Sequence, residues 1–242
     1  MLKGHWESYG ITHIGKIRMI NQDAFLNLPE KNFYLVADGM GGHKDGEYAS
    51  SAIVEALATF APEKTIGTTV SSIYRKLIEV NKTLCQLAKS GGENEVIGST
   101  VAILFNYQKY CVSLWSGDSR IYLFRNGKLN QITNDHNYES FLITSGMSQG
   151  FVKAHPFAQS LTHAVGSEEE LFVEAKLQET KPKDIFLLCS DGLNKELTDG
   201  EIEAMLQATN IKEAIGQLLD LCLLRGARDN ITIVLIQFIG HY

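Results

Sequence analysis

The chain has 242 residues, of which 44% are hydrophobic and 21% charged, a balance typical of a globular protein with one large or two small domains. Its net charge of −6 and the lack of a basic cluster argue against nucleic acid as the main partner. No apolar run approaches the roughly 20 residues of a membrane helix, and the N-terminus lacks the apolar core of a signal peptide. The four cysteines form no CxxC pair and suit a reducing compartment, so we expect a cytoplasmic protein that does not bind membranes.

The first part of the chain contains two apolar runs separated by a polar loop. Residues 8–14 are a candidate strand, residues 24–28 are another, and Arg18 and Asp23 bracket the loop between them. A structural salt bridge between these two side chains is one interpretation. A guanidinium that binds a phosphate is the other.

A buried strand is predicted over residues 33–37, because these five residues carry no charge. Asp38 follows directly, and Gly39, Gly41 and Gly42 then allow the backbone to turn sharply. We therefore expect Asp38 at the end of the strand, pointing out of the core into a turn.

Two amphipathic helices should follow this turn. Apolar side chains recur at helical spacing within residues 46–60, namely Ala49, Ile53, Ala56, Leu57 and Phe60. A second stripe consists of Ile73, Leu77, Val80, Leu84 and Leu87. Ser71 or Ser72 is a candidate cap for this second helix, and Gly91 with Gly92 should end it.

Short strands dominate the middle of the chain. Residues 100–105 and 110–114 flank one turn, while residues 120–124 and 129–132 flank a turn that contains Asn126-Gly127. These connections are too short for parallel crossovers, so the strands should be antiparallel. Asp118 lies between the two hairpins.

The remaining segments alternate between irregular, strand and helical patterns. Residues 135–162 read as a flap, with a helical turn near residues 139–145. Strands are expected at residues 171–177, 185–189 and 231–238. A capping box at residues 198–201 opens a helix toward residue 208, and Asn210 opens another. Helices segregated from antiparallel strands predict an α+β fold built in layers, formed by residues 1–242 as a single domain.

Four aspartates stand beside apolar strands although they lie far apart in the sequence: Asp38, Asp118, Asp191 and Asp229. Such a carboxylate cluster, without His or Cys at ligand spacing, favours a hard cation such as Mg²⁺ or Mn²⁺. Arg18 is a candidate phosphate ligand, and metal with Arg indicates phosphoryl chemistry. The chain contains no Walker loop, Ser nucleophile elbow or reactive-Cys loop, which leaves direct attack by a metal-activated water.

The ordered motifs resemble those of the metal-dependent type 2C protein phosphatases (the PPM family), in particular the small bacterial members. They are Arg18-x-x-Asn21-Gln22-Asp23, Val36-Ala37-Asp38-Gly39-Met40-Gly41-Gly42-His43, Gly98-Ser99-Thr100, Gly117-Asp118-Ser119-Arg120, Ser190-Asp191-Gly192 and Asp229-Asn230-Ile231-Thr232. The resemblance covers essentially the whole chain. It implies a four-layer αββα sandwich, in which two antiparallel sheets are flanked by helices.

The same resemblance implies a Ser/Thr phosphoprotein phosphatase with two tightly bound Mn²⁺ or Mg²⁺ ions and a weaker third. Asp38 would bridge the two ions, the Gly39 carbonyl would bind one, and Asp191 and Asp229 would hold the other. Asp118 with Asp191 would form the third site. Arg18 would bind the phosphate, with Asp23 and Asn230 supporting the ligands from behind.

Substrates would be proteins phosphorylated on Ser or Thr, including a cognate Ser/Thr kinase or the proteins that this kinase modifies, and the protein is expected to be a monomer. Met40 stands where animal members carry His, which leaves the general acid open. We interpret His43 as structural. Two alternatives are a non-catalytic phosphoprotein-binding regulator with the same fold and a phosphatase of small metabolites.

Overall fold

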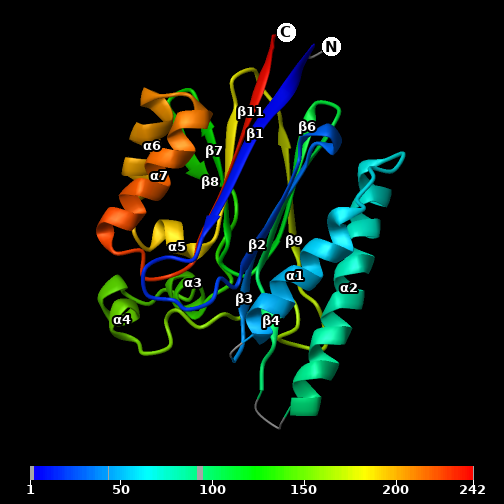
Figure 1. Ribbon diagram of the computed structural model, residues 1–242, viewed down its shortest axis with the longest axis vertical. Coiled ribbons are helices and arrows are strands. Elements are labelled where there is room, and N and C mark those ends of the chain that lie inside the picture. Colours follow the sequence, from blue (N-terminus) through cyan, green and yellow to red (C-terminus); the bar gives the residue numbers. More distant parts are fainter. Residues whose placement is uncertain (1–2, 43, 92–94, 242) are drawn as a thin grey trace.

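Two antiparallel β-sheets lie face to face, and helices cover the outer face of each (Figure 1). This computed structural model describes residues 3–42, 44–91 and 95–241. His43 lies outside the described residues. The fold is therefore α+β with the layer order helix, sheet, sheet, helix, as the sequence and its resemblance predicted.

The first sheet has the strand order β1-β11-β10-β7-β8. Its strands are β1 (Lys3–His13), β11 (Ile231–His241), β10 (Ile185–Cys189), β7 (Arg120–Arg125) and β8 (Lys128–Gln131). Helices α6 (Asp199–Ala208) and α7 (Ile211–Arg225) cover its outer face. The predicted capping box opens α6, and the Asn210 side chain accepts a hydrogen bond from the Glu213 amide at the start of α7.

The second sheet has the order β2-β3-β5-β6-β9, with β4 pairing to β3. Its strands are β2 (Asp23–Leu28), β3 (Phe33–Met40), β4 (Gly98–Ser99), β5 (Val101–Tyr107), β6 (Tyr110–Ser116) and β9 (Glu174–Glu179). Helices α1 (Asp45–Ala58) and α2 (Ile66–Gly91) cover its outer face, and a short 3-10 helix, η1 (Pro29–Lys31), joins β2 to β3.

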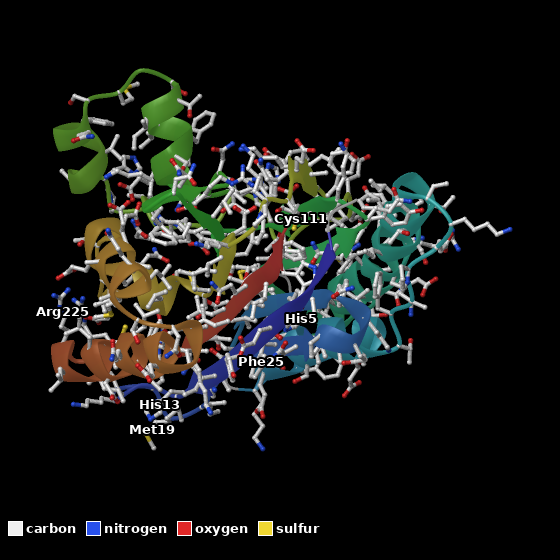
Figure 2. The ribbon with its side chains drawn as sticks, turned by 90° about the horizontal axis from the view of Figure 1, so that it is seen from above. His5, His13, Met19, Phe25, Cys111 and Arg225 are labelled. Atoms are coloured by element: carbon white, nitrogen blue, oxygen red, sulfur yellow. The ribbon has the colours of Figure 1, made fainter. Side chains whose placement is uncertain are left out.

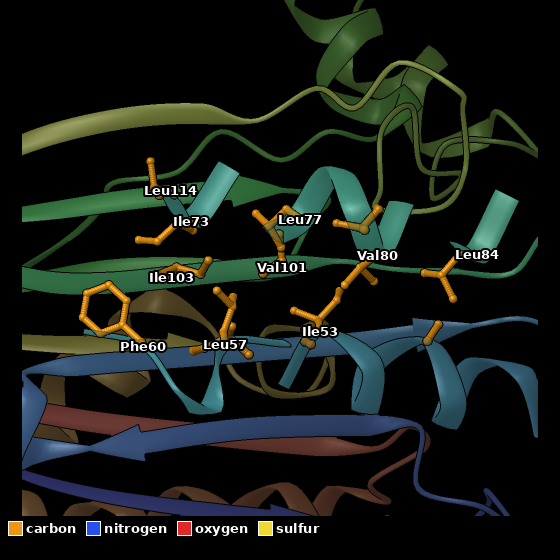
Figure 3. Packing of buried hydrophobic residues seen from close by; sticks show 14 of the residues in the cluster. Ile53, Leu57, Phe60, Ile73, Leu77, Val80, Leu84, Val101, Ile103 and Leu114 are labelled. Atoms are coloured by element: carbon orange, nitrogen blue, oxygen red, sulfur yellow. The ribbon is translucent and has the colours of Figure 1, made fainter. Parts of the chain in front are cut away.

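Strand β3 shows why the central strands read as continuous apolar runs. Successive side chains of a strand point to opposite faces. Phe33 and Leu35 pack toward the helices, whereas Tyr34 and Val36 pack between the two sheets. Figure 3 shows the helix side of this core, where residues of α1 and α2 meet those of β5 and β6. Both faces are thus buried, and apolar residues are needed at every position.

Several element boundaries differ from the predicted ones. Helix α2 begins at Ile66, so the proposed caps Ser71 and Ser72 lie inside it, and the Thr65 hydroxyl accepts a hydrogen bond from the Thr68 amide instead. Leu87 is 39% exposed and lies at the edge of the apolar stripe. Strand β1 begins at Lys3 and β9 only at Glu174.

Strand β3 continues through Asp38 and Gly39 to Met40, so the predicted strand end before the glycines was wrong. Asp38 pairs with Asp23 of β2 in the sheet register, and the next two residues pair with β4. Pairing with β4, which lies some 60 residues away, keeps the backbone extended where local glycine content predicted a turn.

The segment 135–162 contains helix α3 (Tyr138–Thr144), near the predicted helical turn, and helix α4 (Gln149–Ala154), which was not predicted. Its first end is held to the connection between β6 and β7, and its last residue is held to its first end. The His136 amide donates to the Gly117 carbonyl, and the Thr162 amide donates to the His136 carbonyl. No helix in the described parts of the chain is long and apolar enough to cross a membrane.

Candidate metal centre

Strand β3 ends on the side of the sandwich away from the two termini (Figure 1), and the residues at its end help to line a cavity of about 560 Å³. The predicted site residues that line it come from both sheets and their connections: Arg18, Asp38, Gly39, Asp118, Asp191, Asp229 and Asn230. The remaining one, Asp23, is buried behind the cavity, opposite Asp38 in the sheet. The structure therefore brings all the predicted site residues to one place.

Asp38 is held by its backbone. Its amide donates to the Thr100 hydroxyl (3.0 Å), and its carbonyl accepts from the Thr100 amide (2.9 Å) and the Ser99 hydroxyl (3.0 Å). Its carboxyl group is thus left to face the cavity. Burial and then the neighbouring carboxylates, Asp23 first among them, raise the pKa of Asp38 well above its ordinary value.

Gly39 allows strand β3 to pass very close to helix α1. A Cβ atom at this position would lie 1.9 Å from the Gly46 carbonyl oxygen and 2.8 Å from that of Gln22. Only glycine fits there, so the backbone of Gly39 reaches the cavity wall without a side chain in front of it.

Asp23 connects the two sheets. Its Oδ2 accepts hydrogen bonds from the hydroxyls of Ser190 (2.6 Å) and Thr232 (2.7 Å), which belong to the first sheet and its connections. Its Oδ1 is buried without a hydrogen-bond partner among the residues that the structure describes. Burial raises the pKa of Asp23 to about 6, although the two hydroxyls act in the opposite sense.

Asp118 and Asp191 are also buried carboxylates. Asp118 lies in the connection from β6 to β7, where the chain crosses from one sheet to the other, and burial followed by repulsion from Asp191 raises its pKa to about 7. Asp191 opens the short helix α5 (Asp191–Asn194) directly after β10. Burial raises its pKa as well, and its Oδ1 has no hydrogen-bond partner among the described residues.

Asp229 differs from these carboxylates because two cations bind it. Arg18 donates from Nε to Oδ1 (2.8 Å) and from Nη2 to Oδ2 (3.0 Å), and the Lys195 ammonium lies 3.0 Å from Oδ2. Although burial acts in the opposite sense, Arg18 and Lys195 hold the pKa of Asp229 below its ordinary value. Arg18 pairs with Asp229 and not with Asp23, so the structural salt bridge considered for its loop is absent.

Asn230 fixes the loop that carries Arg18. Its Nδ2 donates to the carbonyls of Ile14 (2.8 Å) and Ile20 (3.1 Å), and its Oδ1 accepts from the Gln22 amide (2.8 Å). Figure 2 shows where this loop leaves β1, with Met19 projecting at the edge near His13. One side chain beside Asp229 thus determines the path of the loop.

Besides Glu168, sequence reasoning missed a second charged residue among the described residues that line this cavity, Lys195. It stands four residues after Asp191, a spacing that places two side chains on the same side of a helix. Its ammonium pairs with Asp191 Oδ2 as well as with Asp229. That i, i+4 spacing was the available signal.

The donor set fits a hard divalent cation. All its side-chain donors are carboxylate oxygens, and several are buried against one another. Within the described part of the chain, the Asp191 Oδ1 atom has no hydrogen-bond partner. Within residues 3–42, 44–91 and 95–241, no three His, Cys, Asp or Glu side chains enclose a metal position as they stand. Arg18 and Lys195 occupy oxygens of Asp191 and Asp229 that an ion would need.

The sequence matches a known protein family and several bacterial phosphatases. The family model "Protein phosphatase 2C" matches residues 10–220. The chain is 33% identical over 238 residues to the serine/threonine phosphatase stp of Listeria monocytogenes, with 93% of each chain covered. It is 31% identical over 231 residues to the serine/threonine protein phosphatase PstP of Mycobacterium tuberculosis, covering 94% of this chain and 44% of that one.

Solved structures agree with these matches. PppA of Pseudomonas aeruginosa superposes with a TM-score of 0.90 at 35% identity, covering 99% of this chain and 100% of that one. The catalytic domain of PstP, solved in complex with two manganese ions, superposes with a TM-score of 0.85 at 26% identity, covering 98% and 100%.

The raised carboxyl pKa values predict an unusual pH dependence of stability in excess chelator. The folded-state pKa values of Asp23 (about 6) and Asp118 (about 7) lie above the value of about 4 in an unfolded chain. The folded state therefore binds more protons, and these groups add stability as the pH falls from 7.5 to 5. From Asp23 alone we expect a gain of roughly 1–3 kcal/mol.

The Asp23→Asn variant isolates this contribution from that of His136, whose pKa is lowered by burial and acts in the opposite sense. Urea unfolding of both proteins at several pH values should show the wild type gaining stability relative to Asp23→Asn as the pH falls. A constant difference between the two would contradict the assignment.

Proposed function

Since the chain belongs to the protein phosphatase 2C family and is a metal-dependent Ser/Thr protein phosphatase, we propose that Asp38, Asp191 and Asp229 hold two Mn²⁺ or Mg²⁺ ions in the cavity. The observation that carries this proposal is the convergence of acidic side chains from both sheets on one cavity beside Arg18. The two manganese ions in the PstP catalytic domain support it. Asp38 would hold both ions, and the Gly39 carbonyl would be a further ligand.

When bound, the ions activate a water for attack on phosphorus and neutralise the phosphate oxygens. The residues of the chain position the substrate for that attack. Arg18 is 52% exposed and reaches the cavity from a loop, so its guanidinium can leave Asp229 and bind two phosphate oxygens. Asp23 and Asn230 keep Asp38, Asp229 and the loop in place.

The substrates are phosphoproteins, as for the Ser/Thr phosphatases that the chain resembles. We also propose that the protein opposes a Ser/Thr kinase. Residues 135–162 then act as a flap beside the bound substrate, because Gln159, Leu161 and Thr162 contribute to the cavity wall. Exposed apolar side chains on this flap, such as Phe141 and Phe157, suit contact with a protein substrate.

Metal removal tests the proposal as a whole. Excess EDTA should abolish hydrolysis of phosphothreonine and phosphoserine peptides, and Mn²⁺ or Mg²⁺ should restore it, with Zn²⁺ doing so poorly. Asp38→Asn should lose both the bound metal and the activity, because an amide is a weaker ligand for a hard cation. Full activity in EDTA would overturn the mechanism, and faster turnover of a sugar phosphate than of the phosphopeptides would favour a metabolite phosphatase.

Arg18→Ala should raise KM for a phosphopeptide and lower kcat/KM by roughly ten- to hundredfold, since a charged hydrogen bond contributes about 1.5–3 kcal/mol. Bound metal, measured on the same sample, should not decrease. Arg228→Ala is a matched control, because that guanidinium pairs with Glu196 and is 71% exposed. An unchanged kcat/KM for Arg18→Ala would leave Arg18 with a structural role only.

The Asp118→Asn variant tests whether a third metal ion contributes to catalysis in addition to the first two. Asp118 lines the cavity with Asp191 but is not among the proposed ligands of the first two ions. The variant should therefore fold, keep two ions by calorimetry and turn over phosphopeptide much more slowly. Normal turnover with two ions bound would rule out a catalytic third site.

A further inference from the structure

Lys195 occupies an unusual position for a lysine, because its ammonium lies between two carboxylates that are proposed metal ligands. It pairs with Asp191 Oδ2 and lies 3.0 Å from Asp229 Oδ2. Its side chain is 38% exposed and lines two adjoining cavities, the one described above and a smaller one of about 190 Å³ that Asp118 and Asp191 also line. The ammonium therefore stands at the junction of the acidic groups.

The position of Lys195 is fixed by its backbone. It follows Asp191 by four residues at the end of α5, and its amide donates to the Asp191 carbonyl at 2.9 Å. The side chain can swing, but its base cannot leave the cavity. The ammonium can therefore leave the carboxylates and return to them without any change of the backbone.

Each oxygen of Asp229 is already engaged. Oδ1 accepts from Arg18 Nε and from the Asn230 amide, while Oδ2 accepts from Arg18 Nη2 and from Lys195. An ion held by Asp191 and Asp229 therefore competes with Lys195 for Asp229 Oδ2, and it also meets the ammonium that pairs with Asp191 Oδ2. Arg18 can bind a substrate phosphate once it leaves Asp229. Lys195 has no such new partner, because an ion on these two carboxylates places one positive charge beside another.

We propose that Lys195 is a built-in competitor for the metal ion held by Asp191 and Asp229, so that this one residue weakens metal binding at that position. The inference rests on the proposed function. It makes Lys195 a positioning residue, since it acts through the two carboxylates. It also implies that, without metal, Lys195 stabilises the fold by neutralising charges that would otherwise repel each other.

The test compares four full-length proteins that have been stripped of metal: the wild type, Lys195→Met, Lys195→Arg and Lys128→Met. Lys128 supplies the control, because its ammonium pairs with Glu203 and it lies outside the cavities described here. Both Met variants thus lose one positive charge, although Lys195→Met breaks two ion pairs and Lys128→Met breaks one. Each protein is titrated with MnCl₂ by calorimetry, and its thermal midpoint is measured in EDTA and in saturating MnCl₂.

We expect one of the Mn²⁺ dissociation constants of Lys195→Met to fall by roughly ten- to hundredfold, the effect of removing one charged contact. Lys128→Met should match the wild type, and Lys195→Arg should stay close to it. The thermal midpoint of Lys195→Met should lie below that of the wild type in EDTA and at or above it in MnCl₂. If Lys195 had only a structural role, the thermal midpoint of Lys195→Met would lie below that of the wild type both in EDTA and in MnCl₂.

Unchanged or weaker Mn²⁺ binding by Lys195→Met would overturn the proposal, since Lys195 would then be neutral toward the ion or would organise its ligands. If Lys195→Met does not fold, Lys195→Gln keeps a polar end and repeats the measurement. Failure of the wild type to bind Mn²⁺ would instead overturn the proposed metal centre itself, so the two results are distinguishable.

Discussion

Mutual repulsion among buried carboxylates is the constraint on which this site depends. Asp23, Asp38, Asp118 and Asp191 all have raised pKa values, and burial is the leading cause for each of them. Only Asp229, which Arg18 and Lys195 contact, has a lowered pKa among these five. A protein retains such an arrangement where a cation of higher charge offsets it. The sandwich provides the rigid frame that keeps the charges together.

The two sheets share the task of building the site. The second sheet supplies Asp38 and Asp23 from paired positions, while the first supplies Asp191 and Asp229 beside the ends of β10 and β11. The hydroxyls of Ser190 and Thr232 bind Asp23 across the gap between the sheets. The distance between the carboxylates is therefore set by how the sheets pack. A change in the core between the sheets would also change the geometry of the site.

Much of the fold and of the candidate site could be predicted from the sequence, because the patterns involved lie within short segments or recur in a fixed order along the chain. Apolar periodicity indicated α1, short connections and the Asn126-Gly127 turn indicated the hairpins, and the ordered motifs indicated every proposed ligand. Two features that were not predicted correctly depend on contacts between segments far apart in the sequence. Asp38 stays in a strand because β4 pairs with the residues after it, and the contact of Lys195 with Asp229 joins segments 34 residues apart. Helix α4 is only six residues long, too short for an apolar stripe to form.

The hydrogen bonds of Asn230 have a consequence for how sequences of this family can be recombined. Its amide group holds both carbonyls that frame the Arg18 loop, and its neighbour Asp229 binds the guanidinium at the tip. The loop and the segment before β11 are therefore a single inheritable module although more than 200 residues separate them. A chimera that takes this loop from a relative must therefore also take that relative's residues at positions 229 and 230. Otherwise the loop can lose the hydrogen bonds and the ion pair that hold it.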